Sequence, residues 1–233
     1  MPKRGKRYVE LDKKFDRETD YPLGDAIKLT KEMANAKFDE TVEMHFRLGI
    51  DPRHSDQQVR STVMLPHGTG KKVTVLVFAE SEDARIAEEA GADIIADDEV
   101  LTKIQNGWVD FDATLATPDM MKKVGRVARI LGPRGLMPNP KAGTVVQADD
   151  LPRAINELKA GRVEFRNDKT GNLHIPIGKA SFDENKLIEN AQAVSNAVMA
   201  QMPESIKGLF IRRVTVSATM APGIHVDPSS IIE

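Results

Sequence analysis

The chain has 233 residues, 40% of them hydrophobic and 29% charged, with a formal net charge of −2. This composition is typical of a soluble globular protein with one large or two small domains, and the net charge argues against the overall basicity common in nucleic-acid-binding proteins. The lack of cysteine excludes disulfides, thiol nucleophiles and thiolate zinc sites, and it fits a cytoplasmic protein. No stretch approaches the roughly 18 apolar residues of a membrane span. The basic N-terminus lacks the apolar region of a secretory signal.

The first third of the chain predicts one helix and two strands. Apolar residues recur at helical spacing over residues 25–36. Residues 38–48 then alternate apolar and polar, which predicts a strand with one buried and one polar face. Residues 60–65 are expected to form a partner strand.

The middle of the chain alternates apolar runs with helical patterns. This rhythm predicts a small parallel sheet with helices on both faces. Serine or threonine before two of the helices predicts side-chain caps. The strands are expected at 73–79, 93–96 and 111–117, and the helices begin at Ser81, Asp98 and Thr117–Pro118.

The last third predicts a hairpin, a helix and a strand. Residues 162–166 and 173–177 flank a turn-like segment and are expected to pair as a hairpin. Ser181 and Glu184 have capping-box spacing for the helix that follows. Residues 209–220 alternate again and are expected to form the last strand.

These elements predict an α/β protein of two domains. The first is a split α+β domain, residues 1–67 plus 161–233, whose mostly antiparallel sheet is made from both chain ends. The second is an inserted Rossmann-like parallel α/β domain, residues 68–160. Two connecting segments contain glycine, whose backbone dihedral angles can change readily. They are expected to form a double hinge. The hinge residues are Pro66, Gly68, Gly70, Ala160 and Gly161.

The polar face of the antiparallel sheet is the best candidate for a functional site. RNA recognition needs hydroxyl groups for ribose, basic groups for phosphate and apolar groups that pack on sugars or bases. An ordinary solvent-exposed sheet face has a similar composition, so the pattern alone leaves both interpretations open. The N-terminal tail, with Lys3, Arg4, Lys6 and Arg7, is a further candidate for phosphate contact. The candidates on the sheet are Lys37, Phe38, Thr41, Glu43, His45, Arg166, Lys169, Ser217, Thr219 and Met220.

The sequence shows no motif for catalysis, a metal or a cofactor. Residues 68–72 resemble a phosphate loop, but they precede a strand and do not open a helix. Residues 132–135 follow a helix, which excludes a dinucleotide fingerprint. The five histidines lack metal-ligand spacing. We therefore expect no cofactor, no metal and no enzymatic activity.

The segment 130–144, Ile-Leu-Gly-Pro-Arg-Gly-Leu-Met-Pro-Asn-Pro-Lys-Ala-Gly-Thr, combines three glycines with three prolines. Proline restricts the backbone angle φ and glycine permits unusual values of it, so this composition implies a rigid loop of defined shape. With this loop and other segments in the same order, the chain resembles the bacterial large-subunit ribosomal stalk proteins, the "L-one" family. The other matching segments are 36–43, 49–53, 65–68, 161–171 and 219–220.

The resemblance implies a monomeric, ribosome-associated protein whose split domain binds stalk 23S rRNA. It also implies that the protein moves with the stalk to help deacylated tRNA leave the exit site, and that it represses translation of its own mRNA. The matching RNA-binding positions are Lys37, Phe38, Thr41, Glu43, Arg166, Ser217, Thr219 and Met220; His45, Arg53, Lys169 and Ala221 complete the expected set.

One residue departs from the family pattern, which usually has glycine where this chain has Ala221. A methyl group there is unfavourable if the backbone requires positive φ or closely approaches a ribose.

Two rival functions remain open at this point. One is an enzyme that binds a nucleotide or sugar phosphate on the parallel domain, which the architecture alone supports. The other is a messenger regulator that never enters ribosomes and uses the same sheet face.

Overall fold

The structure, a computed structural model, describes residues 5–206 and 208–231. The chain divides into two compact units, the described parts of Met1–Gly70 with Val163–Glu233, and Lys71–Arg162. The first unit therefore draws on both chain ends, as expected of the split part of the fold. This division is geometric, and the predicted limits of the two folding domains remain a prediction.

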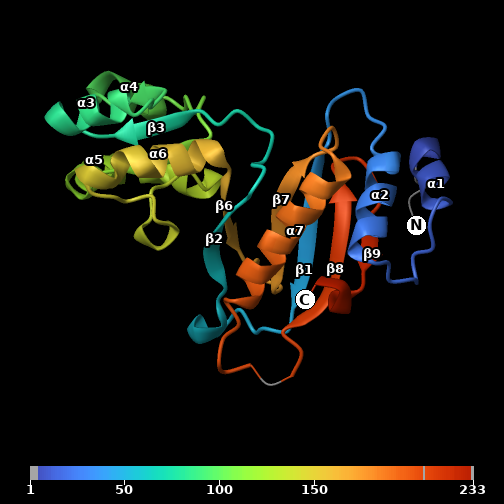
Figure 1. The fold of residues 1–233 in the computed structure, drawn as a ribbon. Helices are drawn as coiled ribbons and strands as arrows, with labels where there is room; N and C mark the ends of the chain where they lie inside the picture. Colours follow the sequence, from blue (N-terminus) through green and yellow to red (C-terminus); the bar gives the residue numbers. More distant parts are fainter. Residues whose placement is uncertain (1–4, 207, 232–233) are drawn as a thin grey trace. The chain divides into compact units, whose positions relative to one another are not determined.

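The first unit is built on a four-stranded sheet with the order β7-β1-β8-β9, antiparallel throughout (Figure 1). A separate two-stranded sheet contains β2 and β6. The strands are β1 (Thr41–Leu48), β2 (Arg60–Met64), β6 (Arg162–Arg166), β7 (Asn172–Lys179), β8 (Ile211–Ala218) and β9 (Ile224–Val226), and the helices are α1 (Lys6–Asp12), α2 (Leu23–Met33) and α7 (Glu184–Met199).

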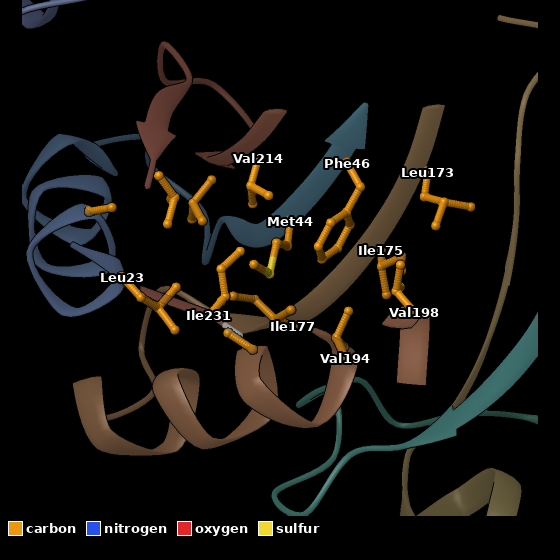
Figure 2. Close-up of a cluster of buried hydrophobic side chains, with 14 of the residues drawn as sticks. Leu23, Met44, Phe46, Leu173, Ile175, Ile177, Val194, Val198, Val214 and Ile231 are labelled. Atoms are coloured by element: carbon orange, nitrogen blue, oxygen red, sulfur yellow. The ribbon is translucent and has the colours of Figure 1, made fainter. Parts of the chain in front are cut away.

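The core of this unit lies between one face of the sheet and helices α2 and α7. Residues of β1 alternate as predicted: Val42, Met44, Phe46 and Leu48 are at most 2% exposed. They pack with apolar residues of β7, β8 and the two helices, as Figure 2 shows. Each such buried side chain contributes roughly 1.5–3 kcal/mol. Because both helices cover one face, the opposite face of the sheet is left to polar residues.

The predicted hairpin is wrong, and so is the predicted partner of residues 60–65. Strand β6 pairs with β2, whereas β7 pairs with β1. The turn itself is local, since Asp168 N–H donates to the Asn172 carbonyl (2.8 Å). Beyond it the strands separate, because β7 buries a full row of apolar residues in the core while β6 buries one, Phe165.

The second unit holds a three-stranded parallel sheet with the order β4-β3-β5, which confirms the predicted parallel sheet. One apolar cluster joins the sheet to α4 and α5, and another joins it to α3 and α6. Helix α6 had no counterpart among the predicted elements. The elements are β3 (Val75–Phe78), α3 (Ser81–Glu89), β4 (Ile94–Ile95), α4 (Asp98–Gln105), β5 (Ala113–Ala116), α5 (Met121–Leu131) and α6 (Leu151–Ala160).

The predicted helix caps are mostly wrong. The Ser181 hydroxyl donates to the Asp39 carboxylate (2.8 Å) instead of capping α7. Ser81 is the first residue of α3, and Thr117 makes no capping hydrogen bond through its side chain. Asp97 does cap α4, since its side chain accepts from Val100 N–H (2.7 Å).

The loop within 130–144 is shaped as its composition suggests. Gly135 and Gly143 have φ values of 72° and 62°, which favour glycine. Arg162 donates to the Ala142 carbonyl (2.9 Å), and a Cβ on Gly143 would lie 2.4 Å from its guanidinium. The loop is therefore closed around an arginine of its own unit.

The first predicted hinge segment is anchored at its start. The Asn190 side chain of α7 accepts from His67 N–H (3.1 Å) and donates to the Gly68 carbonyl (3.0 Å). Gly70 and Gly161 have φ values of 71° and 111°, and Gly161 ends α6. The contacts of Asn190 therefore join the start of this segment to α7. The hinge itself remains a prediction.

Candidate nucleic-acid interface

The polar face of the four-stranded sheet carries the side chains that alternate with the core. On β1 these are Thr41, Glu43, His45 and Arg47. The register places Glu43 opposite Ser217 of β8 and His45 opposite His174 of β7. The residues predicted on β1 and β8 therefore share one surface.

Where β1 begins and β8 ends, two threonines are joined by backbone and side chain. Thr219 N–H donates to the Thr41 carbonyl (3.0 Å), and Thr41 N–H donates to the Thr219 hydroxyl (3.0 Å). Lys179 Nζ donates to the Thr41 hydroxyl (2.8 Å). Two hydroxyls and an ammonium group thus lie together at this end of the sheet.

Behind the threonines lies a buried carboxylate, that of Glu40, which is 1% exposed. It accepts from Ala36 N–H (2.8 Å) and Met220 N–H (2.8 Å), and the Arg7 guanidinium lies 3.6 Å away. One carboxylate therefore fixes the segment before β1 against the turn after β8. We call Lys37, Phe38, Glu40, Thr41, Thr219 and Met220 the Glu40 edge.

The Glu40 edge exposes two large apolar side chains. Phe38 is 55% exposed and Met220 is 52% exposed. Lys37 precedes Phe38 and is also exposed. The backbone of Met220 is held by Glu40, and Phe38 lies in the segment between Ala36 and Glu40, which a hydrogen bond joins. Apolar groups beside hydroxyl and basic groups are the combination that RNA recognition requires.

The centre of the polar face is a histidine pair. His45 Nδ1 lies 2.9 Å from His174 Nδ1, and His45 Nε2 lies 2.9 Å from the Ser217 hydroxyl. Burial and then the neighbouring His174 lower the pKa of His45, while Glu43 opposes the shift. His45 is therefore predominantly neutral at neutral pH, and it orders the side chain of Ser217.

Three of the predicted residues lie at the opposite end of the sheet. Arg166 ends β6, Lys169 lies in the loop between β6 and β7, and Arg53 follows β1. The loop meets the end of β1, where Leu48 N–H donates to the Gly171 carbonyl (2.9 Å). At about 3.3 Å per residue, β1 separates this end from Thr41 by roughly 20 Å. The structure therefore does not bring the predicted residues into one cluster.

Ala221 does not adopt the conformation that would have favoured glycine. Among the described residues, Ser81 is the only non-glycine with positive φ. Ala221 N–H donates to the Ala218 carbonyl (3.1 Å), and the side chain packs against the core. The methyl group at this position therefore costs no backbone strain.

Of the basic N-terminal tail, Lys3 and Arg4 lie outside the described residues. Lys6 begins the short helix α1. Arg7 donates to the Asn35 side chain (2.7 Å) and to the Met220 carbonyl (3.2 Å). One residue of the tail, Arg7, therefore contacts the Glu40 edge directly. Phosphate contact by the tail stays a prediction.

Sequence reasoning missed the roles of Glu40 and Lys179. Glu40 adjoins the start of a strand, and nothing in the pattern distinguishes it from the acidic residues around it. Lys179 becomes relevant only through the register, which pairs it with Thr41. No local signal could have identified either residue, because each acts across the sheet.

The second unit has a pocket at the carboxyl ends of β3 and β4, where α/β proteins often bind ligands. Its lining includes Glu80, Asp97 and Asp98. Lys123 is engaged by the carboxylates of Glu80 and Asp98 (3.5 Å to the latter). A pocket with more carboxylates than cations disfavours the phosphate of a nucleotide or sugar phosphate.

In residues 5–206 and 208–231, no cluster of three or more histidine, aspartate or glutamate side chains is arranged to hold a metal ion. No helix there is long and apolar enough to cross a membrane.

Comparisons with known proteins identify the family of this chain. The model of the "Ribosomal protein L1p/L10e family" matches residues 30–222. The chain is 54% identical over 233 residues to the large ribosomal subunit protein uL1 of Kosmotoga olearia, and 54% identical over 234 residues to that of Thermosipho melanesiensis, with all of each chain covered. Members of this family are cytoplasmic, ribosome-associated structural constituents of the large subunit, they generally bind rRNA, and they are not enzymes. The chain belongs to the ribosomal protein L1p/L10e family.

Proposed function

We propose that this protein binds the stalk 23S rRNA of the large ribosomal subunit through the Glu40 edge. The observation that carries the proposal is the exposure of Phe38 and Met220 near Thr41 and Thr219, where the Thr219 hydroxyl accepts from Thr41 N–H. Apolar side chains left in water at a rigid, polar edge are typical of a binding surface.

Each part of the edge has a role in RNA recognition. The Thr41 and Thr219 hydroxyls can exchange hydrogen bonds with 2′-hydroxyls, which DNA lacks. Phe38 and Met220 can pack on riboses or bases, and Lys37 can contact phosphate. The proposed contact set also includes Ala221, which follows Met220 at the edge. It extends over the rest of the polar face and its far end, with Glu43, His45, Arg53, Arg166, Lys169 and Ser217.

The test is a titration of the full chain with a stalk rRNA fragment. Met220→Ala should weaken binding, whereas Met202→Ala, which removes a methionine of similar exposure beyond the end of α7, should not. Thr219→Val should weaken binding, and Thr219→Ser, which keeps the hydroxyl, should restore it. If Thr219→Val binds as the wild type does, the assignment of the edge is wrong.

The proposal includes a role in the release of deacylated tRNA from the exit site. Lys122, Arg126 and Arg129 of α5 are exposed, and they offer charge for tRNA phosphates. Replacing all three by glutamine should weaken tRNA binding and leave binding of the rRNA fragment unchanged. Equal tRNA affinity in this variant would contradict the role of α5.

The proposal also includes repression of the protein's own mRNA, with the protein acting as a monomer. If the messenger mimics the rRNA site, the two RNAs must compete for the Glu40 edge. A labelled messenger leader should therefore be displaced by the stalk rRNA fragment, and Thr219→Val should weaken both. Simultaneous binding of the two RNAs would exclude a shared site.

We also propose the predicted domain limits, 1–67 plus 161–233 and 68–160, with a hinge at Pro66, Gly68, Gly70, Ala160 and Gly161. The positive φ values of three of its glycines support this assignment. Fluorescence energy transfer between dyes on the two units should change when stalk rRNA and tRNA bind together. A constant transfer efficiency would argue against a moving hinge.

A further inference from the structure

The pairing of β1 with β8 places two arginines directly opposite each other. Arg47 and Arg213 are register partners, and both are exposed. Like charges at directly opposed positions of an antiparallel pair destabilise a sheet. This chain nevertheless keeps two guanidinium groups there.

Neither arginine is neutralised by its neighbours. Arg47 donates to the side-chain oxygen of Asn172 (3.2 Å), which carries no charge. Among residues 5–206 and 208–231, no carboxylate lies within ion-pair distance of Arg47 or Arg213. Asp168, in the loop before β7, is held by backbone and side-chain groups of Thr170 and Asn172.

The groups beside the arginine pair add hydrogen-bonding capacity. The Thr215 hydroxyl lies 3.1 Å from His225 Nδ1, on the strands next to the pair. The charge of Arg213 contributes to lowering the pKa of His225, after burial and against the opposing effect of Asp20. Asp20 and Arg17 act on His225 with opposite signs, so these neighbours leave the charge of the two guanidinium groups available to a phosphate.

We propose that Arg47 and Arg213 form a second, electrostatic contact site for the phosphate backbone of the RNA that the Glu40 edge binds. The pair lies on the same polar face, six residues along β1 from Thr41, which is roughly 20 Å. One RNA helix can span that distance, since a single small domain can contact about 16 base pairs of double-stranded RNA. Arginine is suited to phosphate because its planar donors bind two oxygens at once.

This inference rests on the proposed function, and its test separates the two. The full chain is titrated with the stalk rRNA fragment at about 50 and 200 mM salt, as wild type and as Arg47→Gln/Arg213→Gln. Each lost phosphate contact should make the dependence of log affinity on log salt shallower by about 0.9. The affinity deficit of the double variant should therefore shrink by about tenfold between the two salt concentrations.

Two controls define the outcome. Lys28→Gln/Lys186→Gln removes the same charge from α2 and α7, which cover the other face of the sheet, and should leave the salt dependence unchanged. Arg47→Lys/Arg213→Lys keeps both charges and should retain most of the salt dependence. The denaturant midpoint of the glutamine variant shows whether that variant folds.

The possible results are distinct. A wild type that does not bind the fragment overturns the proposed function. A wild type that binds, with a glutamine variant of equal affinity and equal salt dependence, overturns only the arginine site. In the free protein, either single glutamine substitution should raise the denaturant midpoint, because it relieves the repulsion; a lower midpoint would contradict the unfavourable pairing.

Discussion

The buried carboxylate of Glu40 gives the sharpest test of the Glu40 edge. Its two oxygens accept from Ala36 and Met220 N–H groups, each at 2.8 Å. In Glu40→Gln, the side-chain amide must direct a donor at one of these N–H groups. That change removes one charge-assisted hydrogen bond, worth roughly 1.5–3 kcal/mol, and leaves a buried donor unsatisfied. The half-exposed Arg7 adds little, because its charge stays in water.

We therefore expect Glu40→Gln to lower the free energy of unfolding by about 2–3 kcal/mol. With a slope of about 2–3 kcal/mol per molar urea, the midpoint should fall by about 1 M. Urea unfolding followed by circular dichroism measures this shift, and Glu10→Gln on the exposed surface of α1 is the matched control. The variant should also bind rRNA more weakly, because Met220 is released. An unchanged midpoint would refute the structural role of Glu40.

Three further predictions concern stability. The pKa of His45 is lowered in the folded state, so the unfolded chain binds more protons below pH 6.5. The melting temperature should therefore fall between pH 7.5 and pH 5.5. The fall should be smaller in His45→Gln, which lacks this titrating group. Gly70→Ala should cost about 2–4 kcal/mol in denaturant unfolding, because its Cβ would lie 2.7 Å from the Phe182 ring, whereas Gly208→Ala, which meets only backbone strain, should cost about 1 kcal/mol. Ala221→Gly should leave rRNA affinity equal or tighter while lowering stability by about 0.5–1 kcal/mol; a clear weakening on titration would count against our account of this position.

Much of the fold could be predicted from the sequence, because it depends on local periodicity. The alternation of residues 41–48 and the apolar run of 75–78 identified the central strands of both sheets. The strand partners could not be found in this way. Residues 162–166 and 173–177 are connected by a turn, yet burial of β7 against α7 and pairing with β1 separate them.

The candidate site was predictable only in part. Thr41, Phe38 and Met220 were identified from residue chemistry and from the family resemblance. Glu40 was missed, because its partners lie before β1 and after β8 and are joined only in the folded sheet. The sequence pattern also could not show that the predicted residues lie at both ends of β1, because their positions depend on how the strands pair.

The central claim is that the polar face of this sheet recognises ribosomal stalk RNA specifically. The most direct test is a titration of the full chain with a stalk rRNA fragment and with an RNA duplex of equal length, each at two salt concentrations. The account predicts tight binding of the fragment that weakens with salt, and much weaker binding of the duplex. Equal affinity for the two RNAs would mean that the polar face is ordinary surface, and it would contradict the account.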